Sequence, residues 1–540
     1  MVKTNYALKI TTFENCCTNT NNFNLKAMIK AHTILTKAFC ILLVCMFSFT
    51  SSYSQSEWIT DSLDTFIKRS MQQWQIPGLA VAIVKDGNVV VSKGYGVREN
   101  GKPERVDENT LFMIASNTKS FTSTSIALLD YQKRLSLDDK VTRWIPDFKL
   151  YDHYATNEVT IRDLLCHRIG LQTFQGDFLN WNSSLSRKEL ISRFPLHKPV
   201  YSFRSQYGYC NLAFVTAGEI IPLVTDTSWD DFLRYHYFVP LKMNRTSTTW
   251  NAIANDKNAA KAHTLVNNKL TLVPYANVDN LGPAASINSS VKDMSHWLLM
   301  QLDSGRYDNQ QIVPYPVLRK TYTSQTIINQ LNPSFPSTHF STYGLGWEME
   351  DYAGRKIIHH GGGADGFVTS TCIVPEEQLG IVILTNSDAN WFYDILRKQI
   401  IEAYLNEPYR NLSDLYLERY NANKEKTAEE LATYKTELAK QNKPTLDLYS
   451  YVGDYTNAVY GNMKINNEKG KLILHFQHHP TLTGTLEYLD KDEFLCTYNI
   501  PTYGVKKLPF KIVEGKVESI TVKVSDFVDY MEYEFKKSIK

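Results

Sequence analysis

The sequence lacks any long run in which charges of one sign dominate. Lys and Arg number 58 against 56 Asp and Glu, so the net charge is +2, and no basic block stands out. Nucleic acid is therefore not expected as a partner. No glycine-rich loop of the phosphate-binding type joins a strand to a helix, so no nucleotide cofactor is expected. A content of 43% hydrophobic and 21% charged residues is typical of a folded rather than a disordered chain.

Cysteine is also scarce once the N-terminal segment is set aside. The remaining cysteines are Cys166, Cys210, Cys372 and Cys496. They show neither close pairing nor the spacing of a metal site, so we expect buried thiols and predict no disulfide. His475, His478 and His479 lie close together, but they have no cysteine or carboxylate partner in the pattern. We interpret them as exposed strand residues and predict no metal.

The first 54 residues are predicted to be a secretory signal peptide. Residues 38–47 form an apolar run that is too short to span a membrane, and two lysines precede it. Small residues at Ser52 and Ser54 predict cleavage after Ser54, export to the periplasm and no transmembrane anchor in the mature chain. The segment before Met28 is long for the basic region of a signal, so Met28 is a candidate for the true start. An uncleaved N-terminal anchor is the alternative.

The mature chain begins with a helical pattern and a hairpin pattern. Apolar residues recur at helical spacing over residues 56–75. Two strands are then predicted, over residues 79–84 and 89–92, and Asp86-Gly87 between them is a strong hairpin signal. Strand patterns return late, for example at residues 380–384, after a long stretch that is mainly helical. Strands at both ends with helices between them favour one sheet closed by N- and C-terminal strands.

The stretch around Ser116 contains a candidate nucleophile. A β-prone run, residues 110–114, precedes it, and the apolar residues that follow recur at helical spacing as far as Gln132. Ser116 is therefore expected near a helix N-terminus, where unpaired N–H groups favour developing negative charge. Lys119 lies one turn later on the same face. Burial would lower the pKa of this lysine and allow it to accept the serine proton.

Ser-x-x-Lys alone is weak evidence, because residues 289–292 repeat it. A second element, Tyr209-Cys210-Asn211, follows Ser116 and precedes a helical pattern, although residues 455–457 and 460–462 match it too. The third element is His360 with the glycines at 361–363, which follow one β-like run and precede another. We expect these glycines to form a tight turn between two strands.

In this order and with their flanking residues, the three elements resemble the penicillin-recognising serine enzymes, in the class C-like branch. The resemblance covers residues 57–405, and it includes family-like phrases at 76–82, 160–167, 240–243 and 343–347. It implies an α/β fold of the β-lactamase/transpeptidase type, with a mixed antiparallel sheet flanked by helices and an all-α insertion. His359 also fits the third element, but the later Gly366-Phe367 pair places His360 in the family position. His359 is then expected on the opposite face of the strand.

The resemblance also implies a role for each motif residue. The implied catalytic residues are Ser116, Lys119 and Tyr209, and the implied substrate-binding residues are Asn211, His360, Gly362 and Gly363. Ser116 would attack an acyl carbonyl, and water would release the ester intermediate. Lys119 is expected to lower the pKa of Tyr209, and the sequence leaves open which of the two takes the serine proton. Asn211 would bind the substrate amide, and the backbone N–H groups of Ser116 and Gly363 would hold the oxyanion.

His360 is where the sequence departs from class C β-lactamases and D-alanyl-D-alanine carboxypeptidases. These enzymes have a lysine there that helps to fix the substrate carboxylate, whereas a histidine is largely neutral at pH 7. Family members with histidine include esterases and D-amino-acid peptidases or amidases. We therefore predict an exported serine hydrolase that needs no cofactor and cleaves an ester, an amide or a D-amino-acid-containing peptide.

Other functions remain open at this stage. One group uses the same intermediate: a β-lactamase or carboxypeptidase proper, or an acyltransferase. Another is a non-catalytic penicillin-recognising sensor, and a third is a cell-envelope structural protein whose β domain binds glycan. The intact Ser116, Lys119 and Tyr209 set argues against the sensor. No oligomeric state is predicted, and the partner is a small-molecule or peptide substrate.

The C-terminal part is predicted to hold a linker and a second domain. Residues 406–445 are interpreted as a linker with a helix that starts at a capping box, Thr427 to Glu430, and ends before Pro444. Residues 446–540 are predicted to form an all-β domain, a small barrel. It resembles the lipocalin-like domain often attached behind class C-like serine hydrolases. The predicted strands are residues 472–476, 493–497, 509–513, 517–524 and 530–535.

Overall fold

A computed structural model of the chain describes residues 56–329 and 338–538. The described residues from Trp58 onward belong to one compact unit. The predicted signal peptide, its cleavage after Ser54 and the alternative start at Met28 lie outside the described residues. No helix within the described ranges is long and apolar enough to cross a lipid bilayer.

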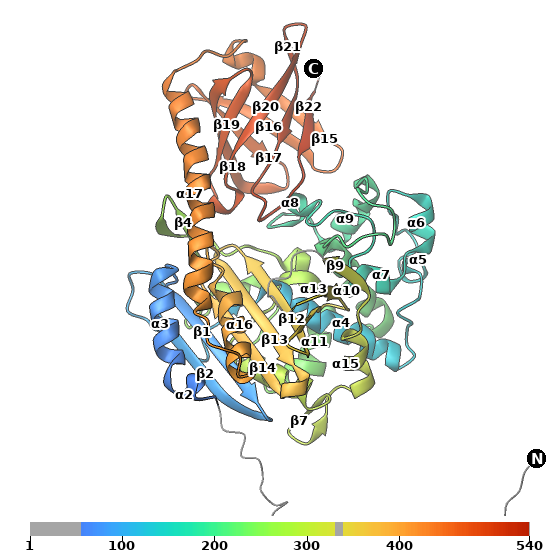
Figure 1. The fold of residues 1–540 in the computed structure, drawn as a ribbon. Coiled ribbons are helices and arrows are strands. Elements are labelled where there is room, and N and C mark those ends of the chain that lie inside the picture. The colour runs from blue at the N-terminus through green and yellow to red at the C-terminus, as the bar shows by residue number, and fades with distance from the viewer. Residues whose placement is uncertain (1–55, 330–337, 539–540) are drawn as a thin grey trace, which may run out of the picture. The chain divides into compact units, whose positions relative to one another are not determined.

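An eight-stranded antiparallel sheet forms the centre of the N-terminal part (Figure 1). Its strand order is β2-β1-β14-β13-β12-β11-β10-β9. The strands are β1 (Gly78–Lys85), β2 (Asn88–Gly96), β9 (Thr326–Asn329), β10 (Ser341–Tyr343), β11 (Glu348–Tyr352), β12 (Arg355–Ala364), β13 (Phe367–Val374) and β14 (Leu379–Thr385). Strand β1, near the start of the domain, pairs with β14, near its end. N- and C-terminal strands therefore join in one sheet, as predicted.

The N-terminal elements match their sequence patterns closely. The predicted helix is present as two pieces, α2 (Glu57–Asp61) and α3 (Leu63–Gln73). The β1–β2 hairpin turns at Asp86 and Gly87, whose φ angles are +50° and +76°. Positive φ at both central turn residues is what the twist of a two-residue hairpin requires, and Asp-Gly tolerates it. This prediction is confirmed.

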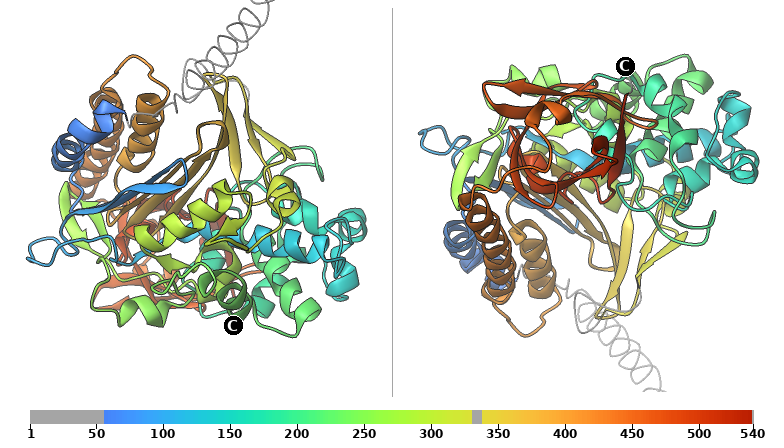
Figure 2. Two further views of the ribbon diagram at one scale, coloured as in Figure 1. Left: turned by 90° about the horizontal axis from the view of Figure 1, so that it is seen from below. Right: turned by 90° about the horizontal axis from the view of Figure 1, so that it is seen from above.

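Both faces of the sheet are covered, so alternate residues of the central strands enter different cores. In β1, Ala80, Ala82 and Val84 belong to one apolar cluster, whereas Leu79 and Val81 belong to the other. The first cluster packs under α14 (Val291–Leu302) and the helical insertion. The second lies under α3 and α16 (Phe392–Tyr404). The two views of Figure 2 show helices on both sides of the sheet.

The chain between β2 and β9 is mainly helical, as the resemblance implied. Its helices are η1 (Ala115–Asn117), α4 (Thr118–Tyr131), α5 (Val141–Trp144), α6 (His153–Glu158), α7 (Ile161–Leu165), α8 (Asp177–Asn180), α9 (Arg187–Ser192), η2 (Phe194–Leu196), α10 (Asn211–Thr225), α11 (Trp229–Leu233), η3 (Arg234–Phe238), α12 (Trp250–Ala254), η4 (Asp279–Leu281), α13 (Gly282–Ala285), α14 and α15 (Tyr315–Thr321). Three short antiparallel strand pairs accompany them. One joins distant segments, β3 (Phe112–Met113) with β6 (Asn288–Ser289), and two are hairpins, β4 (His263–Val266) with β5 (Lys269–Leu272) and β7 (Arg306–Tyr307) with β8 (Gln310–Gln311).

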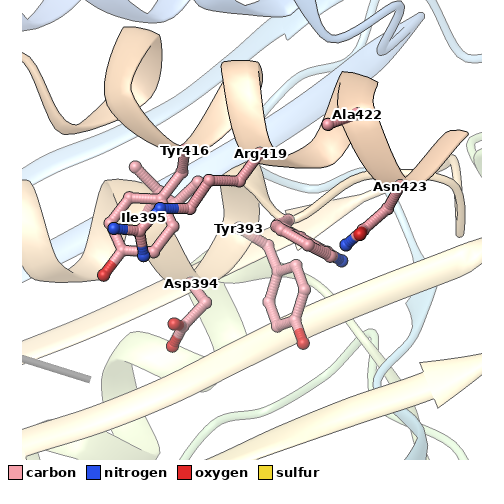
Figure 3. A pocket seen from close by; sticks show the side chains of 8 residues that line it. Tyr393, Asp394, Ile395, Tyr416, Arg419, Ala422 and Asn423 are labelled. Carbon is pink, nitrogen blue, oxygen red and sulfur yellow. The ribbon is translucent and has the colours of Figure 1, made fainter. Parts of the chain in front are cut away.

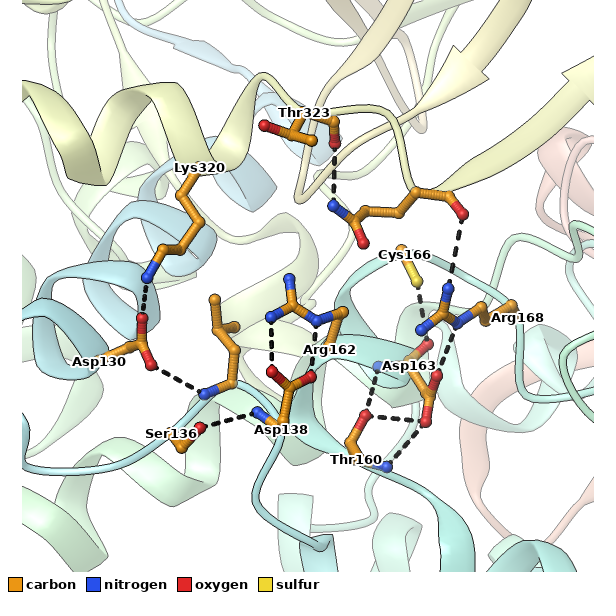
Figure 4. Close-up of polar contacts among 12 residues, drawn as sticks. Asp130, Ser136, Asp138, Thr160, Arg162, Asp163, Cys166, Arg168, Lys320 and Thr323 are labelled. Atoms are coloured by element: carbon orange, nitrogen blue, oxygen red, sulfur yellow. Dashed lines mark hydrogen bonds and ion pairs between the residues drawn. The ribbon is translucent and has the colours of Figure 1, made fainter.

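A buried carboxylate fixes the loop that leads from α7 toward the second motif (Figure 4). Asp163 closes a capping box by accepting hydrogen bonds from Thr160. It also forms ion pairs with Arg168 and Arg204, each with a nearest distance of 2.6 Å. Burial raises the pKa of Asp163, but hydrogen bonds from these partners outweigh it, and the net pKa lies below its ordinary value. The loop that precedes Tyr209 is thereby anchored at Arg204.

The linker prediction is wrong in one respect. A single helix, α17, runs without a break from Leu412 to Ala439, and the side chain of Asn411 caps it by accepting from Asp414 N. The predicted capping box therefore lies inside the helix, where Thr427 Oγ1 donates back to the carbonyl of Asn423. A threonine can bond to a backbone carbonyl one turn earlier as readily as it caps a helix, so the local pattern was ambiguous.

The C-terminal part is a closed antiparallel barrel of eight strands, confirming the predicted all-β barrel (Figure 2, right). Its strands are β15 (Gly453–Asn457), β16 (Gly461–Glu468), β17 (Lys471–Phe476), β18 (His479–Asp490), β19 (Glu493–Tyr498), β20 (Val505–Val513), β21 (Lys516–Val522) and β22 (Tyr533–Lys537). The five predicted strands are present, the last of them starting three residues later than expected. Strands β15, β16 and β18 were not predicted, because polar residues and glycines weaken their β pattern.

The helix α8 connects the barrel to the residues around Ser116. Phe178 of α8 packs among barrel rings, with centroid distances of 4.8 Å to Tyr460 and 5.1 Å to His479. Asp529, between β21 and β22, accepts hydrogen bonds of 3.1 Å from the backbone N–H groups of Gly176 and Phe178. The prediction that His479 is an exposed strand residue is wrong: it is 2% exposed.

Candidate active site

Ser116 lies in the 3₁₀ turn η1, immediately before α4, which confirms the predicted helix start. The residue before it, Ala115, is fully buried and has a φ of +48°, a conformation that costs energy for any residue other than glycine. Asn117 holds the turn in place, because its Nδ2 donates to Ile114 O at 3.0 Å and to Thr369 Oγ1 at 2.8 Å. The nucleophile turn, residues 115–117, is thus fastened to strand β13.

Lys119 is fully buried and points at Ser116. Its Nζ donates hydrogen bonds to Ser116 Oγ at 3.0 Å, Asn211 Oδ1 at 2.7 Å and Ala284 O at 2.9 Å. Burial lowers the pKa of Lys119 to about 7, and the negative charge of Asp177 raises it in part. A lysine with this pKa is substantially neutral at physiological pH, so it can accept a proton from the serine hydroxyl.

Asn211, the first residue of α10, links this lysine to Asp177. Its Oδ1 accepts from Lys119, and its Nδ2 donates to Asp177 Oδ2 at 2.6 Å. Burial raises the pKa of Asp177 to about 6, although bonds from Asn180 and Asn211 oppose the shift. Asn211 lines the cavity as expected of a substrate-binding residue. It also orients Lys119, which the sequence did not suggest.

Tyr209 lies beside Ser116 and Lys119, but its ionisation differs from the expectation. Burial raises the pKa of Tyr209 well above its ordinary value, and a hydrogen bond with Ser116 lowers it only in part. Lys119 Nζ lies 4.7 Å from the centroid of the tyrosine ring. The cation therefore faces the ring, where it makes a cation–π contact. The prediction that Lys119 lowers the Tyr209 pKa is thus corrected.

His360 lines the cavity, whereas His359 points to the other face of the sheet, as predicted. Both ring nitrogens of His360 have protein partners: Nε2 lies 3.0 Å from the hydroxyl of Tyr343, and Nδ1 lies 2.6 Å from the carbonyl of Gly361. A carbonyl only accepts, so Nδ1 carries the proton and Nε2 accepts from the tyrosine. Burial lowers the pKa of His360 to about 3, so the imidazole is neutral at pH 7.

The three glycines after His360 belong to strand β12 and do not form the predicted turn. The turn comes later, at Asp365-Gly366. A Cβ on Gly362 would lie 2.2 Å from Ile114 O and 2.4 Å from Thr369 Oγ1. Glycine is therefore needed there because the nucleophile turn packs directly onto the strand. Gly361 and Gly363 line the cavity, whereas Gly362, expected to bind substrate, faces the nucleophile turn.

A cavity of about 1060 Å³ opens over these residues. Its lining comprises Ser116, Thr173, Phe174, Asp177, Trp181, Tyr207, Tyr209, Asn211, Glu348, His360, Gly361, Gly363, Trp391, Asn423, Asp526, Phe527, Val528 and Tyr530. The last four come from the barrel loop between β21 and β22. The Phe527 ring lies 3.4 Å from where a Cβ on Gly363 would be, and Tyr530 packs against Phe174 with a centroid distance of 5.4 Å. The barrel is thus part of the cavity wall.

A second pocket, of about 600 Å³, adjoins this cavity through Trp391 and Asn423, which line both. Figure 3 shows Tyr393 and Asp394 on one side and Tyr416 and Arg419 on the other. These side chains belong to α16 and α17, respectively.

Residues with metal-ligand or redox chemistry have structural roles in the described part of the chain. Cys166, Cys210, Cys372 and Cys496 are buried free thiols, which confirms the prediction. His475 pairs with Glu468 at 3.0 Å, and His479 Nε2 lies 3.1 Å from the carbonyl of Trp181. Among the described residues, no group of three His, Cys, Asp or Glu side chains gathers as a metal site would require.

The three sequence elements, around Ser116, Tyr209 and His360, come together in the structure. The other matches to the same short motifs lie elsewhere. Ser289, in the second Ser-x-x-Lys, bonds to Thr246, and Tyr455 donates to Tyr451 O inside the barrel. Tyr343 lies in one of the family-like phrases, so the sequence pointed to this residue. Nothing in the sequence indicated its hydrogen bond to His360. Asp177 and Glu348 carried no signal, because their surroundings come from segments far apart in the chain.

Two family models match the chain. The model described as Beta-lactamase matches residues 63–405, and a Domain of unknown function (DUF3471) matches residues 438–537. Among curated relatives, the Protein flp of Staphylococcus aureus (strain MW2) is 26% identical over 367 residues, which are 66% of this chain and 70% of that protein. The Unguisins hydrolase ungD' of Aspergillus campestris is 27% identical over 456 residues, 80% of this chain and 83% of that protein.

Solved structures share the fold at low sequence identity. The octameric penicillin-binding protein homologue from Pyrococcus abyssi superposes with a TM-score of 0.57 at 21% identity, covering 88% of this chain and 100% of that one. A D-stereospecific amidohydrolase from Streptomyces gives a TM-score of 0.51 at 21% identity, covering 63% of this chain and 98% of that one. Together these similarities confirm the α/β fold followed by a barrel.

Proposed function

The chain belongs to the Beta-lactamase family, and from this premise we propose that it is a serine hydrolase that works through an acyl-enzyme on Ser116. The observation that carries the proposal is the pair formed by Ser116 and Lys119. A buried lysine Nζ lies 3.0 Å from the serine Oγ, and its pKa is lowered to about 7. This supplies both a nucleophile and a base that is partly neutral at physiological pH.

The proton transfers follow from these positions. Neutral Lys119 removes the proton as Ser116 Oγ attacks the acyl carbon, and the tetrahedral oxyanion accepts hydrogen bonds from the backbone N–H groups of Ser116 and Gly363. The ammonium of Lys119 returns the proton to the leaving group, with Tyr209 as the neighbouring hydroxyl in the relay. Water then attacks the ester and Lys119 takes its proton. As the acyl–oxygen bond breaks, Lys119 gives this proton to Ser116 Oγ, which regenerates the serine and releases the acid. Lys119 acts as the base because the pKa of Tyr209 is far too high at neutral pH.

The substrate class follows from what the cavity offers a ligand. His360 is neutral, and its ring nitrogens are bonded to Tyr343 and Gly361. Among the described residues that line the cavity, none is Lys or Arg, whereas three carry a carboxyl group. A substrate carboxylate therefore has no cationic partner on this lining. The cavity favours an ester, an amide or a D-amino-acid-containing peptide over a penicillin or a D-alanyl-D-alanine terminus, which carry such a carboxylate.

The names of two similar proteins agree with this substrate class. One relative is named an unguisins hydrolase, and one structural neighbour is described as a D-stereospecific amidohydrolase. We propose the same type of reaction here, hydrolysis at an acyl carbon.

The test is pre-steady-state hydrolysis of a short neutral aryl ester by the purified protein, alongside Ser116→Ala and a matched control, Ser289→Ala. The control removes the serine of the second Ser-x-x-Lys. We expect a burst of phenol and an acyl adduct by intact mass for the parent and the control, and neither for Ser116→Ala. A burst of equal size in Ser116→Ala would overturn the proposal. Turnover of a penicillin faster than of the ester would overturn the substrate class alone.

A further inference from the structure

Glu348 is a carboxylate in the catalytic cavity that has no use in the proposed acyl-transfer steps. It is the first residue of β11 and is partly exposed to the cavity that also contains Ser116. In the described part of the protein, its carboxylate has neither a hydrogen bond nor an ion pair. Carboxylates enclosed by protein normally have such partners, so one without them in a cavity is poised for a ligand.

The surroundings of Glu348 are aromatic. Burial raises the pKa of Tyr207, Tyr209 and Tyr343, and the nearby negative charge of Glu348 raises each of them further. Tyr207 and Tyr209 line the cavity with it. Aromatic rings around a carboxylate form a favourable environment for a cation, because the ring faces and the carboxylate both attract positive charge.

Arg397, the cation whose charge acts on Glu348, is already paired, and so is its neighbour Lys398. Arg397 forms an ion pair with Asp394 and lies 3.5 Å from Glu350, and Lys398 lies 2.8 Å from Asp394. Asp394 and Glu350 thus occupy both cations, and Glu348 has no ion pair among the described residues. Burial raises the pKa of Glu348 to about 7, which reflects the cost of holding this charge without a partner. His359, which is opposite Glu348 on β12, is neutral because burial lowers its pKa.

We infer that Glu348 is the binding site for an ammonium group of the substrate, with the rings of Tyr207 and Tyr209 beside it. The inference rests on the proposed serine hydrolase function and narrows its substrates to amine-bearing esters, amides or peptides. An ammonium supplies the charge and the N–H donors that the carboxylate lacks. It also explains why a cavity with three carboxyl groups has no Lys or Arg in its described lining.

The test compares protonated alkylamines and benzylamine with alcohols of the same size, as competitive inhibitors of neutral aryl ester hydrolysis at pH 8.5. We expect each amine to bind about 10- to 100-fold more tightly than its alcohol, the range of a charge-assisted hydrogen bond. Glu348→Gln is expected to abolish this preference and Glu348→Asp to retain part of it. The amine and the alcohol are compared within each variant, so a change in ester hydrolysis does not enter the comparison. The same ligands are titrated calorimetrically into Ser116→Ala, where turnover plays no part.

Asp526→Asn is the matched control, because it removes another carboxylate from the cavity lining, one that is 60% exposed. It should keep the amine preference. Equal binding of amine and alcohol to the parent, or a preference that survives Glu348→Gln, would overturn the inference. These outcomes are separate from those of the proposed function: loss of the burst in the parent refutes the acyl-enzyme, while calorimetry on Ser116→Ala still reports on Glu348.

Discussion

The side-chain amide of Asn211 donates a 2.6 Å hydrogen bond to the buried carboxylate of Asp177. The same amide accepts from Lys119 through Oδ1, so the carboxylate fixes which end of Asn211 faces the lysine. The negative charge of Asp177 also raises the pKa of Lys119 against the larger lowering by burial. Asp177 is therefore a positioning residue that tunes the proposed base without touching the serine.

This relationship predicts a pH signature. Activity should rise with pH as Lys119 loses its proton, with the acid limb of kcat/KM near its pKa of about 7. In Asp177→Asn the nearby negative charge is gone, so the Lys119 pKa falls and the limb moves to lower pH. The measurement is the pH profile of kcat/KM for a neutral aryl ester. A limb above pH 9 in the parent would assign the base to Tyr209, and an unmoved limb in the variant would contradict the coupling.

A second prediction concerns stability and follows from the same lysine. The pKa of Lys119 is about 7 in the folded protein against 10.5 for an ordinary lysine, so the unfolded chain binds more protons between these values. Stability therefore rises with pH over that window, by about 1.4 kcal/mol per pH unit for this group. Lys119→Met lacks the contribution. The parent should gain about 2 kcal/mol over the variant between pH 7 and 9, measured by urea unfolding. Parallel stability curves would refute the lowered pKa.

Gly361 and Gly362 provide a matched pair of neighbours. A Cβ on Gly362 would lie 2.2 Å from Ile114 O, whereas the nearest atom to a Cβ on Gly361 is 3.9 Å away. Gly362→Ala should lower the free energy of unfolding by about 1–3 kcal/mol and displace the nucleophile turn. Gly361→Ala should stay within about 0.5 kcal/mol of the parent. Urea unfolding compares the two, with burst amplitude as the second readout for Gly362→Ala. Equal stability of the two variants would mean that the strand and the turn are not in close contact.

The sequence predicts an element correctly where its pattern depends on neighbouring residues alone. The Asp86-Gly87 hairpin and the helix after Ser116 depend on residues within a few positions, and both are confirmed. The turn predicted at the glycines after His360 is wrong, because a glycine run in a strand differs from one in a turn only through a distant partner. That partner is Ile114 O, more than 200 residues earlier in the chain.

The same reasoning explains what the sequence missed in the site. Asp177 and Glu348 have roles only because folding brings α8 and β11 to the cavity, and no local spacing encodes that. The predicted fall in the Tyr209 pKa would require the Lys119 ammonium to lie near the phenol oxygen. In the structure the ammonium lies over the ring, and burial dominates. A pKa shift inferred from a nearby charged residue has the wrong direction when burial of the titrating group has the larger effect.

The last prediction links the barrel to catalysis through Asp529. Its carboxylate accepts from the backbone N–H groups of Gly176 and Phe178, the two neighbours of Asp177. In Asp529→Ala the Phe178 N–H loses its acceptor, and the Gly176 N–H keeps only the hydroxyl of Tyr533. The Asp177 backbone is then held less firmly, and the bond to Asn211 weakens. We expect kcat for a neutral aryl ester to fall about tenfold, because Lys119 is then held less firmly in place. Asp526→Asn, three residues away on the same loop, should retain kcat within about twofold, because the ion pair of Asp526 in the described part of the protein is with Lys523 and not with α8. If Asp529→Ala keeps the parent kcat and acid limb, the barrel loop is only a wall of the cavity and does not position Asp177.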